Sequence, residues 1–187
     1  MNDTSTPVID PEVDYEKSIK RQRLVYKPTG SVVFTKIFDY GLSIFFIGIA
    51  IDGLFQSIRD HQTNIFSLGI SSLVIVWLTS NLYFNNNLVK FQGKSIEKNK
   101  EDLLNTLDVF FSSYNFIINN DEMLRSFQPH GNPIWGRIIT VLFKDDLIYL
   151  NITTLGRSDS PTWIHGLFNF IKAKRIARYY RKYYFSN

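Results

Sequence analysis

The sequence predicts a membrane protein in which a two-helix transmembrane hairpin is followed by a small cytoplasmic α+β domain. Two long apolar runs indicate the hairpin, Lys and Arg beside these runs indicate its orientation, and alternating apolar residues farther along indicate an antiparallel sheet. The chain therefore divides into a polar N-terminal tail (1–35), the hairpin (36–87) and the α+β domain (88–187).

The two predicted spans cover about residues 37–58 and 65–84. A helix rises 1.5 Å per residue, so about 20 residues cross a hydrocarbon core of about 30 Å. The second run meets this length without a charge, whereas Asp39 and Asp52 interrupt the first. A mid-membrane Asp costs roughly 2.5–3.5 kcal/mol, which neighbouring Ile and Phe residues offset, and Arg59 lies two turns beyond Asp52 as a pairing candidate. The alternative, two core helices of a soluble protein, is disfavoured because the second run has no polar face.

Basic residues near the spans predict the orientation of the hairpin. They are dense before the first span and after the second, whereas the connection (56–64) holds only Arg59. By the positive-inside rule both termini lie in the cytoplasm, so the prediction is a multi-pass protein of the cell (inner or plasma) membrane. The flanking residues are Lys17, Lys20, Arg21, Arg23, Lys27 and Lys36 before the first span, and Lys90, Lys94, Lys98 and Lys100 after the second.

The tail changes from acidic to basic along its length. Residues 1–16 contain acids and no bases, and the composition of the first ten predicts disorder. Residues 17–36 contain bases and no acids, so we expect them to lie along anionic lipid headgroups of the inner leaflet. The membrane-contact residues predicted here are Lys17, Lys20, Arg21 and Arg23.

The C-terminal hundred residues predict the element order α-β-β-β-β-α, with helices covering an antiparallel sheet. Asn99 is the predicted N-cap of the first helix, and Ser160 with Pro161 the predicted start of the last. Two hairpins are expected between the helices, turning at Asn120-Asp121 and Asp145-Asp146. The predicted elements are a helix from about 99 to 111, strands 114–119, 122–128, 137–144 and 147–154, and a helix from 161 towards 184.

The last helix has two halves of different character. Its first half is expected to pack through an apolar stripe of Ile164, Leu167, Phe168 and Ile171. Its second half is basic, with interleaved tyrosines, and has three interpretations: contact with the inner leaflet, a solvated helix end, or nucleic-acid binding. The leaflet is favoured and nucleic acid disfavoured, because the domain is tethered close to the bilayer. The basic residues in question are Lys174, Arg175, Arg178, Arg181 and Lys182.

The absence of cysteine and of several known motifs argues against several kinds of chemistry. The chain has no Cys, which removes disulfides, thiolate metal sites and cysteine nucleophiles, and it lacks the common nucleotide, kinase and hydrolase motifs. His61 lies across the bilayer from His130 and His165, so we expect no three-His metal site, and no cofactor is expected.

The best ligand candidate is the loop before the last helix, where Arg157, Ser158 and Ser160 offer donors to a phosphate or carboxylate. The alternative is an ordinary capped helix in which Asp159 pairs with Arg157.

These observations lead to a functional hypothesis of a non-enzymatic, membrane-anchored binding or scaffolding module. Its partner is a protein docked on the cytoplasmic domain or a second copy of the chain. The alternative is a small membrane effector or sensor that binds an anionic ligand near Arg157 and whose oligomerised hairpins perturb the bilayer. A third hypothesis is a membrane immunity-type protein, and enzymatic activity is the least favoured.

Overall fold

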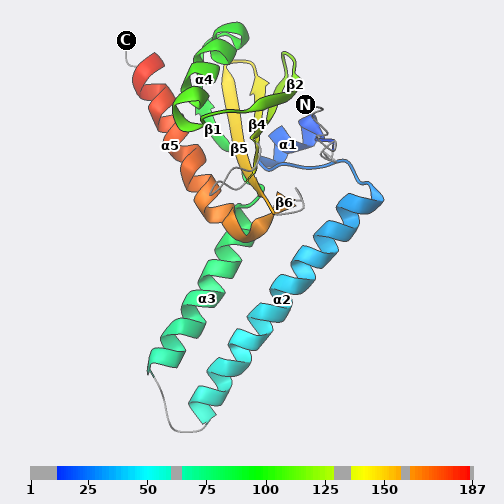
Figure 1. Ribbon diagram of the computed structural model, residues 1–187, viewed down its shortest axis with the longest axis vertical. Helices are drawn as coiled ribbons and strands as arrows, with labels where there is room; N and C mark the ends of the chain where they lie inside the picture. Colours follow the sequence, from blue (N-terminus) through cyan, green and yellow to red (C-terminus); the bar gives the residue numbers. More distant parts are fainter. Residues whose placement is uncertain (1–11, 60–64, 129–135, 157–160, 186–187) are drawn as a thin grey trace, which may run out of the picture.

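The chain forms a long helical hairpin joined to a sheet domain that is covered by helices (Figure 1). The computed structural model describes residues 12–59, 65–128, 136–156 and 161–185. The predicted turn around His130, the outer connection with His61 and the first eleven residues lie outside this described part. The helices are α1 Tyr15–Arg21, α2 Gly30–Arg59, α3 Ile65–Phe84, α4 Ile96–Phe110 and α5 Gly166–Tyr184, with the 3-10 turn η1 Trp163–His165 before α5.

The sheet is antiparallel, with the strand order β1-β5-β4-β3-β2 and a short β6 paired to the end of β5. The four predicted strands are confirmed as β2 to β5. The turn at Asp145-Asp146 is also confirmed, and Asp145 takes the left-handed conformation that a tight hairpin needs (φ 54°). At the other turn the Asn120 side chain accepts hydrogen bonds from the backbone of Glu122 and Met123. The strands are β1 Val89–Gln92, β2 Asn115–Asn119, β3 Met123–Gln128, β4 Arg137–Lys144, β5 Leu147–Leu155 and β6 Pro161–Thr162.

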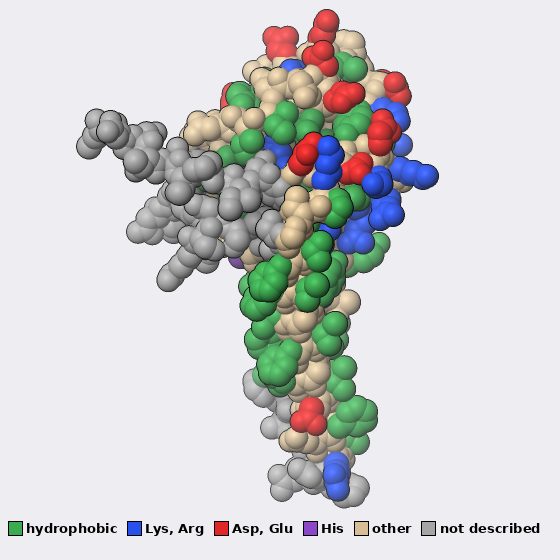
Figure 2. Space-filling view, turned by 90° about the vertical axis from the view of Figure 1, so that its right-hand side faces the viewer, with side chains coloured by type: hydrophobic (Ala, Val, Ile, Leu, Met, Phe, Trp, Pro, Cys, Tyr) green, Lys and Arg blue, Asp and Glu red, His purple; other side chains and the backbone are tan. Residues whose placement is uncertain are grey.

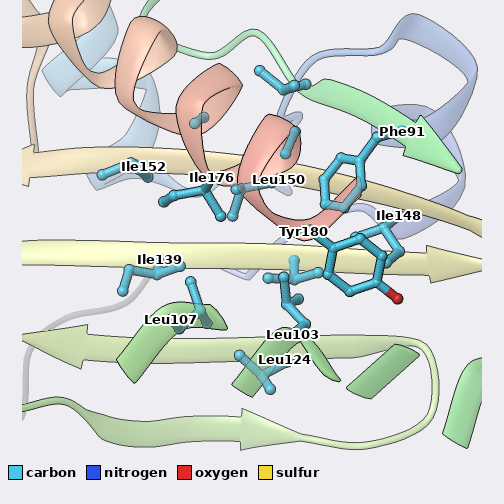
Figure 3. Close-up of a cluster of buried hydrophobic side chains, with 14 of the residues drawn as sticks. Phe91, Leu103, Leu107, Leu124, Ile139, Ile148, Leu150, Ile152, Ile176 and Tyr180 are labelled. Carbon is cyan, nitrogen blue, oxygen red and sulfur yellow. The ribbon is translucent and has the colours of Figure 1, made fainter. Parts of the chain in front are cut away.

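The main core lies between the sheet and the pair α4 and α5 (Figure 3). Side chains alternate between the two faces of a strand, so Ile148, Leu150 and Ile152 of β5 share this face, where all three are buried. Helices α4 and α5 contribute Leu103, Leu107, Ala173, Ile176, Ala177 and Tyr180 to the same cluster.

The opposite face of the sheet is covered by the segment around α1. Val13, Ile19 and Leu24 are buried against Leu142 and Tyr149 of the sheet. The sequence reveals only the polar character of this segment, because its few apolar residues are widely spaced. The domain is therefore a three-layer structure in which the N-terminal segment forms the third layer.

Three details differ from the predicted elements. The short strand β1 was not predicted, and it precedes the first helix of the domain. Helix α4 begins with Ser95 as N-cap, so Asn99 is not the cap. Instead the buried Asn99 side chain bonds the backbone of Lys94 and accepts a hydrogen bond from Tyr180 Oη at 3.0 Å. Pro161 lies in β6 and not in the first turn of a helix, because the chain pairs once more with β5 before turning.

The predicted packing stripe of α5 is wrong. Of its four residues, Ile164 (in η1), Phe168 and Ile171 are exposed, at 42%, 59% and 46% of their surface, and Leu167 is half-buried. The side of the helix that is buried in the core instead carries Ala173, Ile176, Ala177 and Tyr180. The predicted stripe therefore lies mainly on the side of the helix that faces away from the core.

Candidate functional site at the hairpin junction

The hairpin has an apolar surface that no other part of the described chain covers. Within the described residues one helix, Val32–Gln56, is long and apolar enough to cross a membrane. Only 6% of its most apolar 18-residue stretch is buried by the protein. Leu68–Phe84 is a shorter apolar helix. Figure 2 shows hydrophobic side chains over this shaft, with Lys and Arg gathered on the adjoining part of the sheet domain and Asp and Glu mainly at the far end.

The helices α2 and α3 contact each other through small residues. Ser43 is fully buried in the hairpin, and its hydroxyl donates to the carbonyl of Asp39 at 2.6 Å, one turn earlier. Gly53 faces Ser71 closely enough that a Cβ on Gly53 would lie 3.8 Å from the Ser71 hydroxyl oxygen. Small side chains at these positions let the two helices approach each other closely.

The two acids predicted inside the hairpin differ in their surroundings. Asp39 is half-buried near the end of α2 that adjoins the sheet domain. Asp52 is exposed, and Gln56 donates a hydrogen bond to its carboxylate at 2.8 Å. The polar partner shown for Asp52 is therefore Gln56, one turn along the helix, in place of the predicted Arg59.

Asn81 joins the hairpin to α5. It is fully buried, and its side chain donates to the carbonyl of Trp77 at 2.8 Å and accepts from the backbone N–H of Leu167 at 3.0 Å. The second bond satisfies a free N–H in the first turn of α5, so Asn81 acts as a helix cap supplied by another helix. Gly166 packs against the same site, and the rings of Phe84 and Phe170 stack with centroids 4.6 Å apart.

A second connection runs from the end of the hairpin to the sheet. The side chain of Asn151, on β5, donates to the carbonyls of Asn85 and Asn87 at 3.1 and 3.0 Å. Asn151 is only 3% exposed, so these bonds are largely shielded from water. The residues that follow α3 are therefore fixed to the middle of the sheet.

The N-terminal segment completes the junction. Arg23 donates to the carbonyl of Tyr83 at 3.3 Å and lies 5.8 Å from the centre of its ring. The backbone N–H of Leu24 donates to Asn86, and that of Leu88 donates to Gln22. The N-terminal segment, which precedes α2, is therefore bonded to the end of α3 and to the residues that follow it.

The predicted membrane-contact residues fall into two groups. Lys17, Lys20 and Arg21 are exposed on α1, although Lys17 pairs with Asp14 at 2.8 Å. The other group lies on α5, which begins at the junction and runs obliquely away from it (Figure 1). The exposed residues of this second group are Lys174, Arg175, Arg178, Arg181 and Lys182.

A cluster of cations lies at the start of α5 beside the sheet. Burial and the neighbouring guanidinium groups of Arg137 and Arg175 lower the pKa of Lys172 to about 8. Burial and Arg137 also lower the pKa of His165. The Lys172 ammonium lies 4.0 Å from the centre of the Phe111 ring. This cluster favours the approach of an anion, because an anion relieves repulsion among the cations.

The sequence did not identify Asn81, Asn151 and Gly166 as junction residues. The only available signal was a polar Asn81 within an otherwise apolar run. The predicted ligand loop of Arg157, Ser158 and Ser160 lies outside the described residues. Among the residues that are described, no group of His and acidic side chains is arranged to hold a metal ion. Protein-family models, curated proteins and solved structures give no match to this chain.

Proposed function

We propose that this chain is an integral membrane protein in which α2 and α3 cross the bilayer as a hairpin. The hairpin holds the sheet domain at the cytoplasmic surface, where the domain acts as a non-enzymatic binding or scaffolding module. The observation that carries the proposal is the apolar surface of α2, of which almost nothing is buried by the protein.

The low burial of α2 distinguishes a membrane-spanning helix from a core helix of a soluble protein. A core helix of a soluble protein can be equally long and apolar, but the protein itself covers such a helix. Here Phe34, Phe55 and Leu73 are 71%, 68% and 70% exposed, at well-separated positions along the hairpin. An apolar surface of this extent is unfavourable in water and favourable in lipid.

The polar residues at the two ends of α2 fit the thickness of a bilayer. At 1.5 Å per residue, Lys36 and Arg59 lie about 35 Å apart along the helix. A hydrocarbon core is about 30 Å thick, so both cations reach headgroup regions. Basic residues concentrate on the side of the sheet domain, which supports a cytoplasmic location for that domain.

Topology is tested by cysteine labelling, because the chain has no cysteine of its own. A membrane-impermeant maleimide applied to intact cells is expected to label His61→Cys in the connection. Glu97→Cys, on the exposed side of α4, is expected to react only after permeabilisation. Recovery of the chain in the soluble fraction without detergent would refute the membrane assignment, and the opposite labelling pattern would refute the orientation.

The binding role is tested separately by measuring the mass of the complex extracted in a mild detergent. A second component at fixed stoichiometry, lost when the sheet domain is altered but the hairpin is intact, supports a binding module. A chain that is monomeric and without a partner contradicts it.

One observation favours the effector hypothesis as a second candidate. Asp52 is exposed on the lipid-facing hairpin, whereas ionisable residues inside membranes almost always face other protein groups or water. Hairpins that assemble with Asp52 on the inside would satisfy this rule. This candidate predicts growth arrest or membrane depolarisation on expression, lost in Asp52→Asn, and harmless strong expression would contradict it.

A further inference from the structure

We propose that the outer face of α5 docks on the anionic inner surface of the same bilayer that holds the hairpin. The apolar first half of this face enters the boundary between headgroups and acyl chains, and the basic second half contacts lipid phosphates. This inference rests on the proposed membrane function and specifies how the sheet domain is oriented on the membrane.

The outer face of α5 is one continuous stripe of exposed side chains. Residues three and four apart share a helix face, and the face opposite the sheet carries large apolar residues followed by bases. This pattern, apolar at one end and basic at the other, is typical of helices that lie in a membrane interface. In chain order the stripe is Ile164 of η1, followed by Phe168, Ile171, Arg175, Arg178 and Lys182 of α5, all of them exposed.

The position of the apolar half matches the level of the bilayer surface. Leu167 is capped by Asn81 of α3, and Phe170 stacks on Phe84 at the end of the same helix. The first turns of α5 therefore lie beside the point where α3 leaves the membrane. Figure 1 shows α3 and α5 diverging from this contact in a V, with the outer face of α5 turned away from the sheet.

The charges along the stripe match an anionic surface. Within the described part of the chain, Arg175, Arg178 and Lys182 form no ion pair with an acid, so their charge is available to lipid phosphates. Beside the stripe, burial and the charges of Arg137 and Arg175 lower the pKa of Lys172. Each base near an anionic leaflet adds about 1 kcal/mol of attraction, about fivefold in the docked population.

The apolar residues argue for lipid as the occupant. Phosphate recognition alone does not require Ile164, Phe168 and Ile171 to be exposed, and a free anionic ligand would leave them in water. Lipid accounts for both halves of the stripe, because the same surface offers an apolar layer beneath a layer of phosphates.

Depth-dependent fluorescence quenching tests the inference on the full chain in vesicles. An environment-sensitive fluorophore is placed at Phe168→Cys, and the lipids carry spin-label quenchers on their headgroups or acyl chains. Val109→Cys on α4 is the matched control, since both side chains are 59% exposed on helix surfaces. Leu73→Cys, on α3, reports whether the hairpin itself lies in lipid. The vesicles contain phosphatidylcholine with or without phosphatidylserine.

We expect quenching at position 168 and none at 109, with more quenching when phosphatidylserine is present. Arg178→Ala is expected to lower the ratio of docked to undocked helix about fivefold. No quenching at 168 while position 73 is quenched overturns the docking inference and leaves the membrane proposal intact. No quenching at position 73 overturns both. A blue shift at 168 without lipid quenching also overturns the inference, because it indicates a protein partner on this face.

Discussion

Gly166→Ala is expected to disrupt the close contact between the end of α3 and the start of α5, and so to destabilise the protein. A Cβ at position 166 would lie 2.2 Å from the carbonyl oxygen of Asn81 and 2.8 Å from the backbone N of Asn85. Ordinary contact begins at about 3.4 Å, so the end of α3 must move by more than 1 Å. The obstructing atoms belong to the backbone, and no side-chain rotation relieves the clash.

The magnitude follows from two effects. Overpacking at a closely packed contact costs about 1–3 kcal/mol. Movement of α3 also breaks the bond from the Leu167 N–H to Asn81, worth about 1 kcal/mol. We therefore expect Gly166→Ala to lower the free energy of unfolding by about 2–4 kcal/mol. Its helical backbone contributes no conformational strain of its own (φ −53°).

Urea unfolding of the detergent-solubilised protein measures this loss, and Trp163 provides a buried fluorescence signal three residues away. Gly41→Ala on α2 is the control, because a Cβ there meets nothing within 4 Å. Faster hydrogen exchange at Leu167 is expected in Gly166→Ala and unchanged exchange in Gly41→Ala. A loss below about 0.5 kcal/mol for Gly166→Ala, within the range of an ordinary surface change, would refute the close α3–α5 contact.

Two further predictions concern the sheet domain. Lys172 has its pKa lowered to about 8 in the fold, from 10.5 when exposed, so between pH 8 and 10 the unfolded chain binds more protons and stability rises with pH. Denaturation midpoints across this range are expected to rise in the wild type and to rise less in Lys172→Met, and parallel curves would contradict the shift. Tyr180→Phe removes the hydrogen bond to Asn99 while keeping the ring, and calorimetry is expected to show a loss of about 1 kcal/mol. Tyr183→Phe, at a 54% exposed position, serves as its control, and an equal loss in both variants would exclude the Asn99 bond as the cause.

Much of the sheet domain could be predicted from sequence because its signals are local. The alternation of apolar residues predicted the boundaries of β4 and β5 to within one residue. It also predicted the turn between them at Asp145-Asp146. The short β1 was missed because four residues carry too little pattern to distinguish a strand from a linker. The N-terminal layer was missed because Val13, Ile19 and Leu24 follow no single period.

The candidate site was harder to predict because long-range contacts create it. Asn81 caps a helix more than eighty residues later in the chain, and nothing local to either segment indicates this bond. Strand alternation puts Asn151 on the face of β5 opposite Ile148, Leu150 and Ile152, but its partners in the hairpin end could not be deduced from spacing.

By itself the sequence determined where the apolar runs lie, how charge is distributed beside them, and which side chains of β5 share a face. All three depend on composition and on periods of a few residues. Only the tertiary structure decided which face of α5 is buried, because that helix has apolar residues on two sides. Ala173, Ile176, Ala177 and Tyr180 are buried in the core against the sheet, and Ile164, Phe168 and Ile171 are left outside. Apolar residues on both sides of the first half of the helix leave its orientation open, so the contacts of α5 with the sheet and with α3 determine the outcome.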